Sequence, residues 1–140
     1  MGTVELRWTA LRGDSDRWWG ISPAIYAYLA PRADEILYIG KADGGSSVRR
    51  RWDAADKDEF WDDLEGQRGI FERRAIASEF WLSPGARLTS QLVCDVESLL
   101  ISEIKPWGNI ACRGDRIRRP GLVVRCRGQA WPGRRVFRDR

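Results

Sequence analysis

Two short apolar runs in the first third of the chain predict a β-hairpin. In residues 24–30 and 36–40, one set of alternate positions is aliphatic, and the other set includes Tyr26 in the first run and Tyr38 in the second. The stretch 31–35 between the two runs is polar and contains a proline. Alternation with a period of two places successive side chains on opposite faces of a strand. Because the intervening stretch is typical of a turn, we predict two neighbouring strands that direct tyrosines toward the same place.

Apolar spacing along the rest of the chain predicts three helices and further strands in one domain. A chain of 140 residues is the size of one domain with one core. We predict an α/β (α+β) fold, with a small antiparallel sheet flanked by helices and extended by extra terminal strands. Besides the hairpin, the expected elements are a strand at 3–11, a helix from about residue 47, a short helix within 56–68, a strand at 73–83, a helix at 89–104 that Pro106 ends, and a strand at 122–124.

The predicted hairpin carries two triplets with a familiar spacing. Ala24-Ile25-Tyr26 is followed, after eleven residues, by Tyr38-Ile39-Gly40. This pattern resembles the signature of the GIY-YIG nuclease superfamily, with Ala24 in the place of the usual first glycine. Since two short apolar-aromatic triplets occur by chance in many β-rich chains, the resemblance depends on residues further along the chain.

Two later blocks extend the resemblance in the same order along the chain. Val48 is followed three places later by Arg51, as at the start of the family's first helix. Glu97 is followed by Pro106 and Asn109, a spacing similar to that of the family's metal-binding glutamate, proline and asparagine. The resemblance covers roughly residues 23–110, and it implies the GIY-YIG fold.

The activity that the resemblance implies is hydrolysis of a phosphodiester by an endonuclease that uses one divalent metal, Mg²⁺ or Mn²⁺. Glu97 would be the metal ligand, and Arg51 would neutralise charge on the phosphoryl group. The two signature tyrosines would activate the attacking water, which requires help from nearby cations because a phenol has a pKa of about 10. The candidate catalytic residues are Tyr26, Tyr38, Lys41, Arg51, Glu97 and Asn109.

The helical pattern alone leaves the choice of carboxylate open. Glu97 falls inside the apolar stripe of the predicted helix, where a carboxylate costs several kcal/mol unless it is paired or binds a metal. Glu103 also falls near that stripe, and it is the family spacing that selects Glu97. The alternative is that Glu97 lies at the edge of the core and pairs with an arginine. The signature tyrosines could likewise be ordinary aromatic packing in the sheet.

Positive charge is concentrated at the C-terminal end of the chain. Residues 113–140 contain ten arginines against two aspartates, a local charge of +8 that leaves −4 for residues 1–112. We interpret 1–112 as the nuclease-like domain and 113–140 as an arginine-rich extension that binds nucleic acid, with DNA favoured over RNA. The candidate contacts are Arg49, Arg50, Trp131, Arg134, Arg135 and Arg138. For Trp131, packing against the domain is the alternative.

Other functions find little support in the residue inventory. The chain has no histidine, and its three cysteines form no C-x-x-C pair, which disfavours zinc chemistry and histidine base catalysis. The glycine loop at 42–45 lacks the spacing of a phosphate-binding loop. No run is apolar and long enough to span a bilayer. We expect a cytoplasmic protein with neither a membrane partner nor a small-molecule cofactor.

Two alternatives of another class remain open. A protein with this fold could have lost the reaction and kept only nucleic-acid or partner binding, and Ala55 stands where many family members have histidine or tyrosine. The basic extension could instead bind an acidic protein. Joint retention of the candidate catalytic residues favours the enzyme, because binding alone requires no such set.

Overall fold

The structure, a computed structural model, describes residues 2–13, 17–31, 34–52, 57–109 and 119–139. It has a mixed α+β architecture, and in these ranges no helix is long and apolar enough to cross a lipid bilayer. Its elements are β1 (Thr3–Ala10), the 3-10 helix η1 (Arg17–Gly20), β2 (Ala24–Leu29), β3 (Ile36–Ala42), α1 (Val48–Trp52), α2 (Asp58–Arg68), β4 (Arg74–Leu82), α3 (Ser90–Ile104), β5 (Val123–Arg127) and β6 (Val136–Arg138).

The predicted strands and helices all form, and one strand was missed. The type and approximate bounds of β1 to β4 and of α1 to α3 are confirmed, and so is the strand expected near residue 122. The strand β6 was not predicted because its three residues are too few to show alternation. Thr89 caps α3 by accepting a hydrogen bond from the backbone N–H of Leu92 at 3.1 Å.

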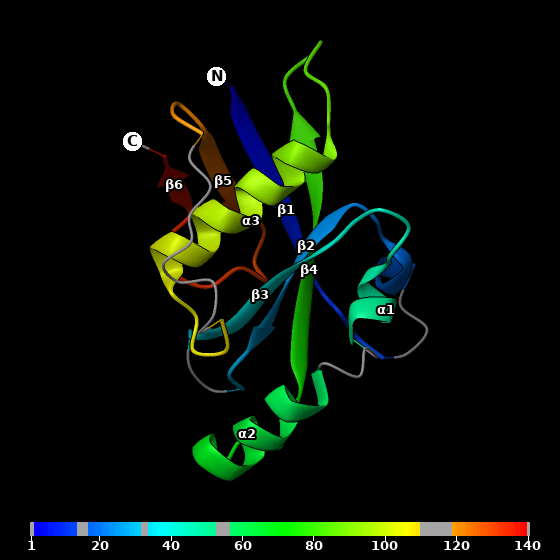
Figure 1. Cartoon of the computed structure of the whole chain (residues 1–140), viewed down its shortest axis with the longest axis vertical. Helices are drawn as coiled ribbons and strands as arrows, with labels where there is room; N and C mark the ends of the chain where they lie inside the picture. The colour runs from blue at the N-terminus through cyan, green and yellow to red at the C-terminus, as the bar shows by residue number, and fades with distance from the viewer. Residues whose placement is uncertain (1, 14–16, 32–33, 53–56, 110–118, 140) are drawn as a thin grey trace.

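The six strands form one curled sheet in the order β3-β2-β4-β1-β5-β6 (Figure 1). Neighbouring strands are antiparallel except β1 and β5, which are parallel. The expectation of a purely antiparallel sheet is therefore wrong at this one pair. Strand β1 lies between β4 and β5, antiparallel to the first and parallel to the second, so β4 and β5 run in opposite directions on its two sides. Helix α3, which follows β4, covers one face of the sheet.

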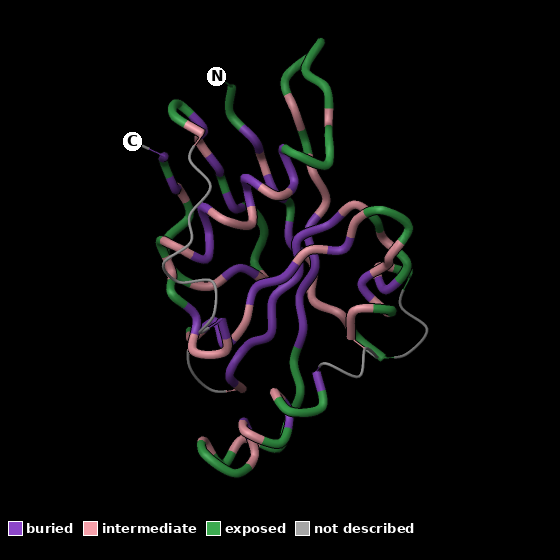
Figure 2. The backbone as a smooth tube through the Cα atoms, in the orientation of Figure 1, coloured by how far each residue is buried: buried purple, intermediate pink, exposed green. Residues whose placement is uncertain are grey.

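The two faces of the sheet bury separate hydrophobic clusters. Alternation along β2 places Ile25 and Ala27 in the cluster under α3, and it places Tyr26 and Tyr28 in the opposite cluster with residues of α1, α2 and η1. All six residues of β2 are buried, and Figure 2 shows the buried backbone gathered in the central strands. A strand that is buried on both sides explains why residues 24–29 are a nearly continuous apolar run.

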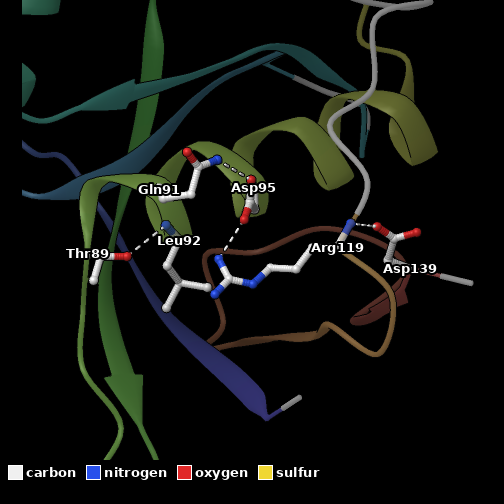
Figure 3. A network of polar contacts seen from close by, with 6 residues as sticks. All are labelled: Thr89, Gln91, Leu92, Asp95, Arg119 and Asp139. Carbon is white, nitrogen blue, oxygen red and sulfur yellow. Dashed lines mark hydrogen bonds and ion pairs between the residues drawn. The ribbon is translucent and has the colours of Figure 1, made fainter.

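The C-terminal extension is part of this sheet. Strand β5 pairs with β1, and β6 pairs with β5. Before β5, the guanidinium of Arg119 donates to the buried carboxylate of Asp95 on α3 at 2.5 Å, and its backbone N–H donates to Asp139 at 2.6 Å (Figure 3). Gln91 donates to the other oxygen of Asp95 at 2.8 Å. The extension is thus tied to the helix that carries Glu97.

Candidate active site

A pocket of about 320 Å³ brings together residues from four elements that are far apart in the sequence. Five of the six predicted catalytic residues line it, and only Asn109 does not. Because β3 is the edge strand of the sheet, residues of α3 on one face and of α1 on the other reach the same pocket past its edge. The lining residues are Tyr26 of β2, Tyr38, Gly40 and Lys41 of β3, Asp43, Ser46, Arg51 of α1 and Glu97 of α3.

Gly40 leaves room for the ring of Tyr26. The two residues pair directly across β2 and β3. A Cβ atom on residue 40 would lie 2.4 Å from the Tyr26 hydroxyl oxygen and 2.4 Å from its Cζ, far inside van der Waals contact. The glycine of the Tyr-Ile-Gly triplet therefore has a steric role, because it lets the phenol of the opposite strand lie across the backbone and reach the pocket.

Asn109 acts on the backbone and lies outside the pocket. Its side-chain amide donates to the carbonyl of Ile39 at 2.8 Å, and its side-chain oxygen accepts from the N–H of Ile39 at 2.8 Å. Ile39 lies between Tyr38 and Gly40 on an edge strand, whose outer backbone groups would otherwise lack a neighbouring strand. Asn109 is buried, so this pair of bonds is shielded from water. It is a positioning residue for Tyr38.

Burial dominates the ionisation of the two signature tyrosines. It raises the pKa of Tyr26, while a hydrogen bond from Arg51 and the charge of Arg51 partly oppose it. The pKa of Tyr38 is also raised by burial, and the nearby Tyr26 and Glu97 raise it further. Both side chains are therefore neutral phenols near neutral pH. Arg51 supports a phenolate at Tyr26 more strongly than at Tyr38.

Glu97 is half-buried, and three cations surround its carboxylate. Burial raises its pKa, whereas the charges of Lys41, Arg51 and Lys57 and a backbone hydrogen bond from Lys41 lower it. The other glutamate that the helical pattern left open, Glu103, is exposed and pairs with Arg134 at 3.2 Å. The structure thus separates the two carboxylates: Glu97 lines the pocket of the signature tyrosines, and Glu103 lies outside that pocket in an exposed ion pair.

Sequence reasoning missed three residues at or beside the pocket. Asp43 and Ser46 line it, although the sequence marks them only as loop residues. Lys57 is buried, and its ammonium lies 4.9 Å from the centroid of the Tyr38 ring. Asp43 and Ser46 lie just beyond the predicted strand of Tyr38, and this proximity in the sequence could have identified them as candidate site residues. Lys57 lies in a strongly charged stretch and carries no comparable signal, and the departure noted at Ala55 lies outside the described residues.

The arginines at the start of α1 have different surroundings. The guanidinium of Arg49 lies 4.6 Å from the ring centroid of Trp19, while the side chain of Arg50 is exposed. Arg51 faces the pocket. The choice of Arg51 over its two neighbours as the site arginine agrees with this geometry.

Trp131 is a core residue, and the expectation that it contacts nucleic acid is wrong. Only 2% of its surface is exposed, and its ring centroid lies 4.7 Å from that of Trp8 and 6.3 Å from that of Phe137. Its indole N–H donates to the carbonyl of Arg134 at 2.7 Å. A nucleic-acid base cannot stack on an indole ring whose faces are already covered by other side chains.

The other tail candidates are exposed arginines, two of which also support the local fold. Arg134 pairs with Glu103 and donates to the carbonyl of Val136 at 2.9 Å. The guanidinium of Arg135 donates to the carbonyls of Cys126, Gly128 and Trp131 at 3.1 to 3.3 Å. Arg138 is exposed on β6. None of the three lines the pocket of Glu97.

Comparisons with models of protein families, with curated proteins and with solved structures gave no match to this chain.

The donor set of the pocket fits a small, hard cation. Its side chains offer carboxylate, phenol and hydroxyl oxygens from Glu97, Asp43, Tyr26, Tyr38 and Ser46, and Mg²⁺ prefers oxygen ligands and retains several waters. Among the described residues no group of three or more histidine, cysteine, aspartate or glutamate side chains is placed to hold a metal ion. A cation here would be held by one or two carboxylates together with water and a substrate oxygen.

We predict that Asn109→Ala lowers the free energy of unfolding by about 2 to 6 kcal/mol, because it leaves two buried backbone groups of Ile39 unpaired at roughly 1 to 3 kcal/mol each. Urea denaturation measures the change. Gln129→Ala, which removes an exposed amide, is the matched control and should have little effect. Equal stability of the two variants would contradict the role given to Asn109.

We predict that Glu97→Gln stabilises the fold at pH 7 in chelator but not at pH 4. The pKa of the carboxyl is raised above its ordinary 4.5 by burial, so the folded state binds its proton more tightly than the unfolded state does. Its contribution to stability is complete below the unfolded pKa and falls as the pH rises through the folded pKa. Urea denaturation at both pH values tests this, and a difference independent of pH would show that burial is not the cause.

Proposed function

We propose that this protein is a divalent-metal-dependent endonuclease of the GIY-YIG type that hydrolyses phosphodiester bonds of DNA, with RNA as a second possible substrate. The observation that carries the proposal is the convergence of Tyr26, Tyr38, Lys41, Arg51 and Glu97 in one pocket. These five come from four elements, and they were selected from the sequence by the order and spacing of separated blocks. Packing alone gives no reason for two phenols, two cations and a carboxylate to share a cavity.

In this proposal the cations of the pocket bind the scissile phosphate. Arg51 and Lys41 come from different elements and line the same cavity as the tyrosines. A guanidinium forms paired, charge-assisted hydrogen bonds to phosphate oxygens. Negative charge grows on those oxygens as water attacks phosphorus and the bond to the leaving oxygen breaks, so preorganised positive charge lowers the barrier.

Tyr26 is the better placed of the two phenols to accept the proton of the attacking water. Both a hydrogen bond from Arg51 and the charge of Arg51 lower the pKa of Tyr26 against the effect of burial. At Tyr38, Arg51 lowers the pKa through its charge. Tyr38 orients the water or the phosphate as a neutral phenol. A divalent cation held by Glu97, with Asp43 nearby, would supply further positive charge in the pocket.

The raised pKa values of both tyrosines favour one alternative. A phenol that stays protonated is a weak base, and a protein with this pocket could bind nucleic acid without cleaving it. Such a catalytically inactive protein would keep Arg51 and Lys41 for phosphate binding, but it would have no use for a carboxylate beside that phosphate. The carboxylate of Glu97 therefore favours the enzyme.

We predict that the purified protein nicks or degrades DNA with Mg²⁺ or Mn²⁺ and is inactive in chelator. Glu97→Gln should lower the cleavage rate by at least about 100-fold and leave DNA affinity nearly unchanged, because it removes the metal ligand and keeps the shape. Gel assays on single-stranded, duplex and branched DNA and on RNA measure both properties. If all these substrates stay intact with both metals, the enzyme proposal fails.

We predict that Arg51→Ala lowers the cleavage rate at saturating DNA by about 100-fold, the scale seen when one preorganised donor to a developing anion is removed. Arg50→Ala is the matched control, since Arg50 is exposed on the same short helix, whereas Arg49 packs on Trp19. Single-turnover kinetics isolate the chemical step. Equal rates for the two variants would place the working arginine elsewhere.

A further inference from the structure

A second pocket adjoins the proposed active site on the other side of Tyr38. It has a volume of about 260 Å³, and Tyr38 lines both pockets. None of the residues predicted as catalytic or nucleic-acid-binding lines it except Tyr38. The residues that matter for its chemistry are Tyr38 of β3, Lys57, Glu59, Phe60 and Asp63 in and just before α2, and Trp107 and Gly108 after α3.

Three aromatic rings line this second pocket. The centroids of Tyr38 and Phe60 are 5.4 Å apart, and those of Phe60 and Trp107 are 6.1 Å apart. All three side chains are only partly buried, in contrast to the covered rings of Trp61 and Trp131. The three rings contact one another and form one aromatic wall of the pocket. A partly exposed aromatic wall suits a flat, conjugated ligand, and every nucleobase offers such a face.

The backbone at Gly108 is fitted closely to the aromatic wall. A Cβ atom on residue 108 would lie 2.4 Å from Cε1 of Phe60 and 2.8 Å from the carbonyl oxygen of Leu37. The N–H of Gly108 donates to that carbonyl at 2.6 Å. Gly108 thus joins the pocket to β3 next to Tyr38, and the same short segment carries Trp107 and Asn109. The second pocket and the site tyrosine therefore share one support.

The polar groups of the second pocket suit a base and disfavour a phosphate. Helix α2 contains five carboxylates against Arg68, and two of them, Glu59 and Asp63, line the pocket. Carboxylates repel phosphate, but they accept hydrogen bonds from exocyclic amino groups such as N4 of cytosine or N6 of adenine. The buried Lys57, with its ammonium 4.9 Å from the centroid of Tyr38, adds a donor on the side of the active site.

We propose that this second pocket binds one unpaired base of the substrate, next to the phosphate that is cleaved, with a preference for bases that carry an exocyclic amino group. The inference rests on the proposed nuclease function and narrows its substrate to single-stranded DNA or DNA with an unpaired or extruded nucleotide. A base that remains stacked and paired in a duplex cannot place a face against the aromatic wall of the pocket. Tyr38 separates the base from its phosphate and contacts both.

The test uses the Glu97→Gln protein, so that binding is measured without cleavage. Its Kd is determined at one fixed salt concentration for three labelled duplexes: fully paired, with one unpaired cytosine, and with an abasic site at that position. We expect the tightest binding to the unpaired cytosine. Adding Trp107→Ala should weaken that binding at least about fivefold and leave the paired duplex unchanged, since stacking on one aromatic residue is worth about 1 to 3 kcal/mol.

Two further variants keep the test decisive. Trp107→Phe keeps an aromatic face and should retain most of the preference, even if Trp107→Ala disturbs the fold. Phe71→Ala removes a ring that is 74% exposed and outside the second pocket, so it should change nothing.

A loss of affinity that is equal for all three duplexes, or no loss at all, would overturn the base-binding proposal. If the wild-type protein still cleaves DNA in that case, only this proposal fails and the nuclease function stands. Absence of both cleavage and DNA binding would overturn the two together.

Discussion

The site depends on the hydrogen bonds by which Gly108 and Asn109 satisfy the outer backbone groups of edge strand β3. An edge strand has one row of backbone groups without a neighbour. Here Gly108 donates to the carbonyl of Leu37, and the amide of Asn109 pairs with both backbone groups of Ile39. The segment after α3 thus takes the place of a seventh strand. It fixes the backbone on each side of Tyr38, and it fixes the end of the helix that carries Glu97.

This arrangement at the edge strand explains how residues from opposite faces of a sheet meet. Tyr26 belongs to the cluster under α1 and α2, whereas Glu97 projects from the helix on the other face. They reach one pocket because β3 ends the sheet and because Gly40 lacks a side chain where Tyr26 crosses it. A central strand in that place would have kept the phenols and the carboxylate apart. The glycine and the asparagine are therefore as necessary to the pocket as the residues that line it.

The sequence predicted the fold well wherever a period was long enough to show, as in the alternation of β2 and the helical spacing of α3. It did not predict β6 or the parallel pairing of β5, because neither short strands nor strand direction leave a periodic trace. Tyr26, Tyr38, Arg51 and Glu97 were gathered by motif order, which no single helix or strand pattern could have supplied. The error at Trp131 has a physical cause. Its flanking arginines indicated an exposed surface, but the guanidinium of Arg135 donates to backbone carbonyls in and after β5, and the indole packs on Trp8.

The ionisation of the pocket shows a tension between stability and chemistry. Burial raises the pKa of Tyr26, Tyr38 and Glu97 together, and it thereby favours in each the protonated form, which is the less useful one for the proposed hydrolysis. Arg51 opposes burial at all three, and Lys41 and Lys57 oppose it at Glu97. A carboxylate whose ionised form is disfavoured by burial gains most from a ligand of opposite charge, because binding relieves that penalty. The same burial that makes the pocket unfavourable for an isolated charge would therefore make it selective for a cation and a phosphate together.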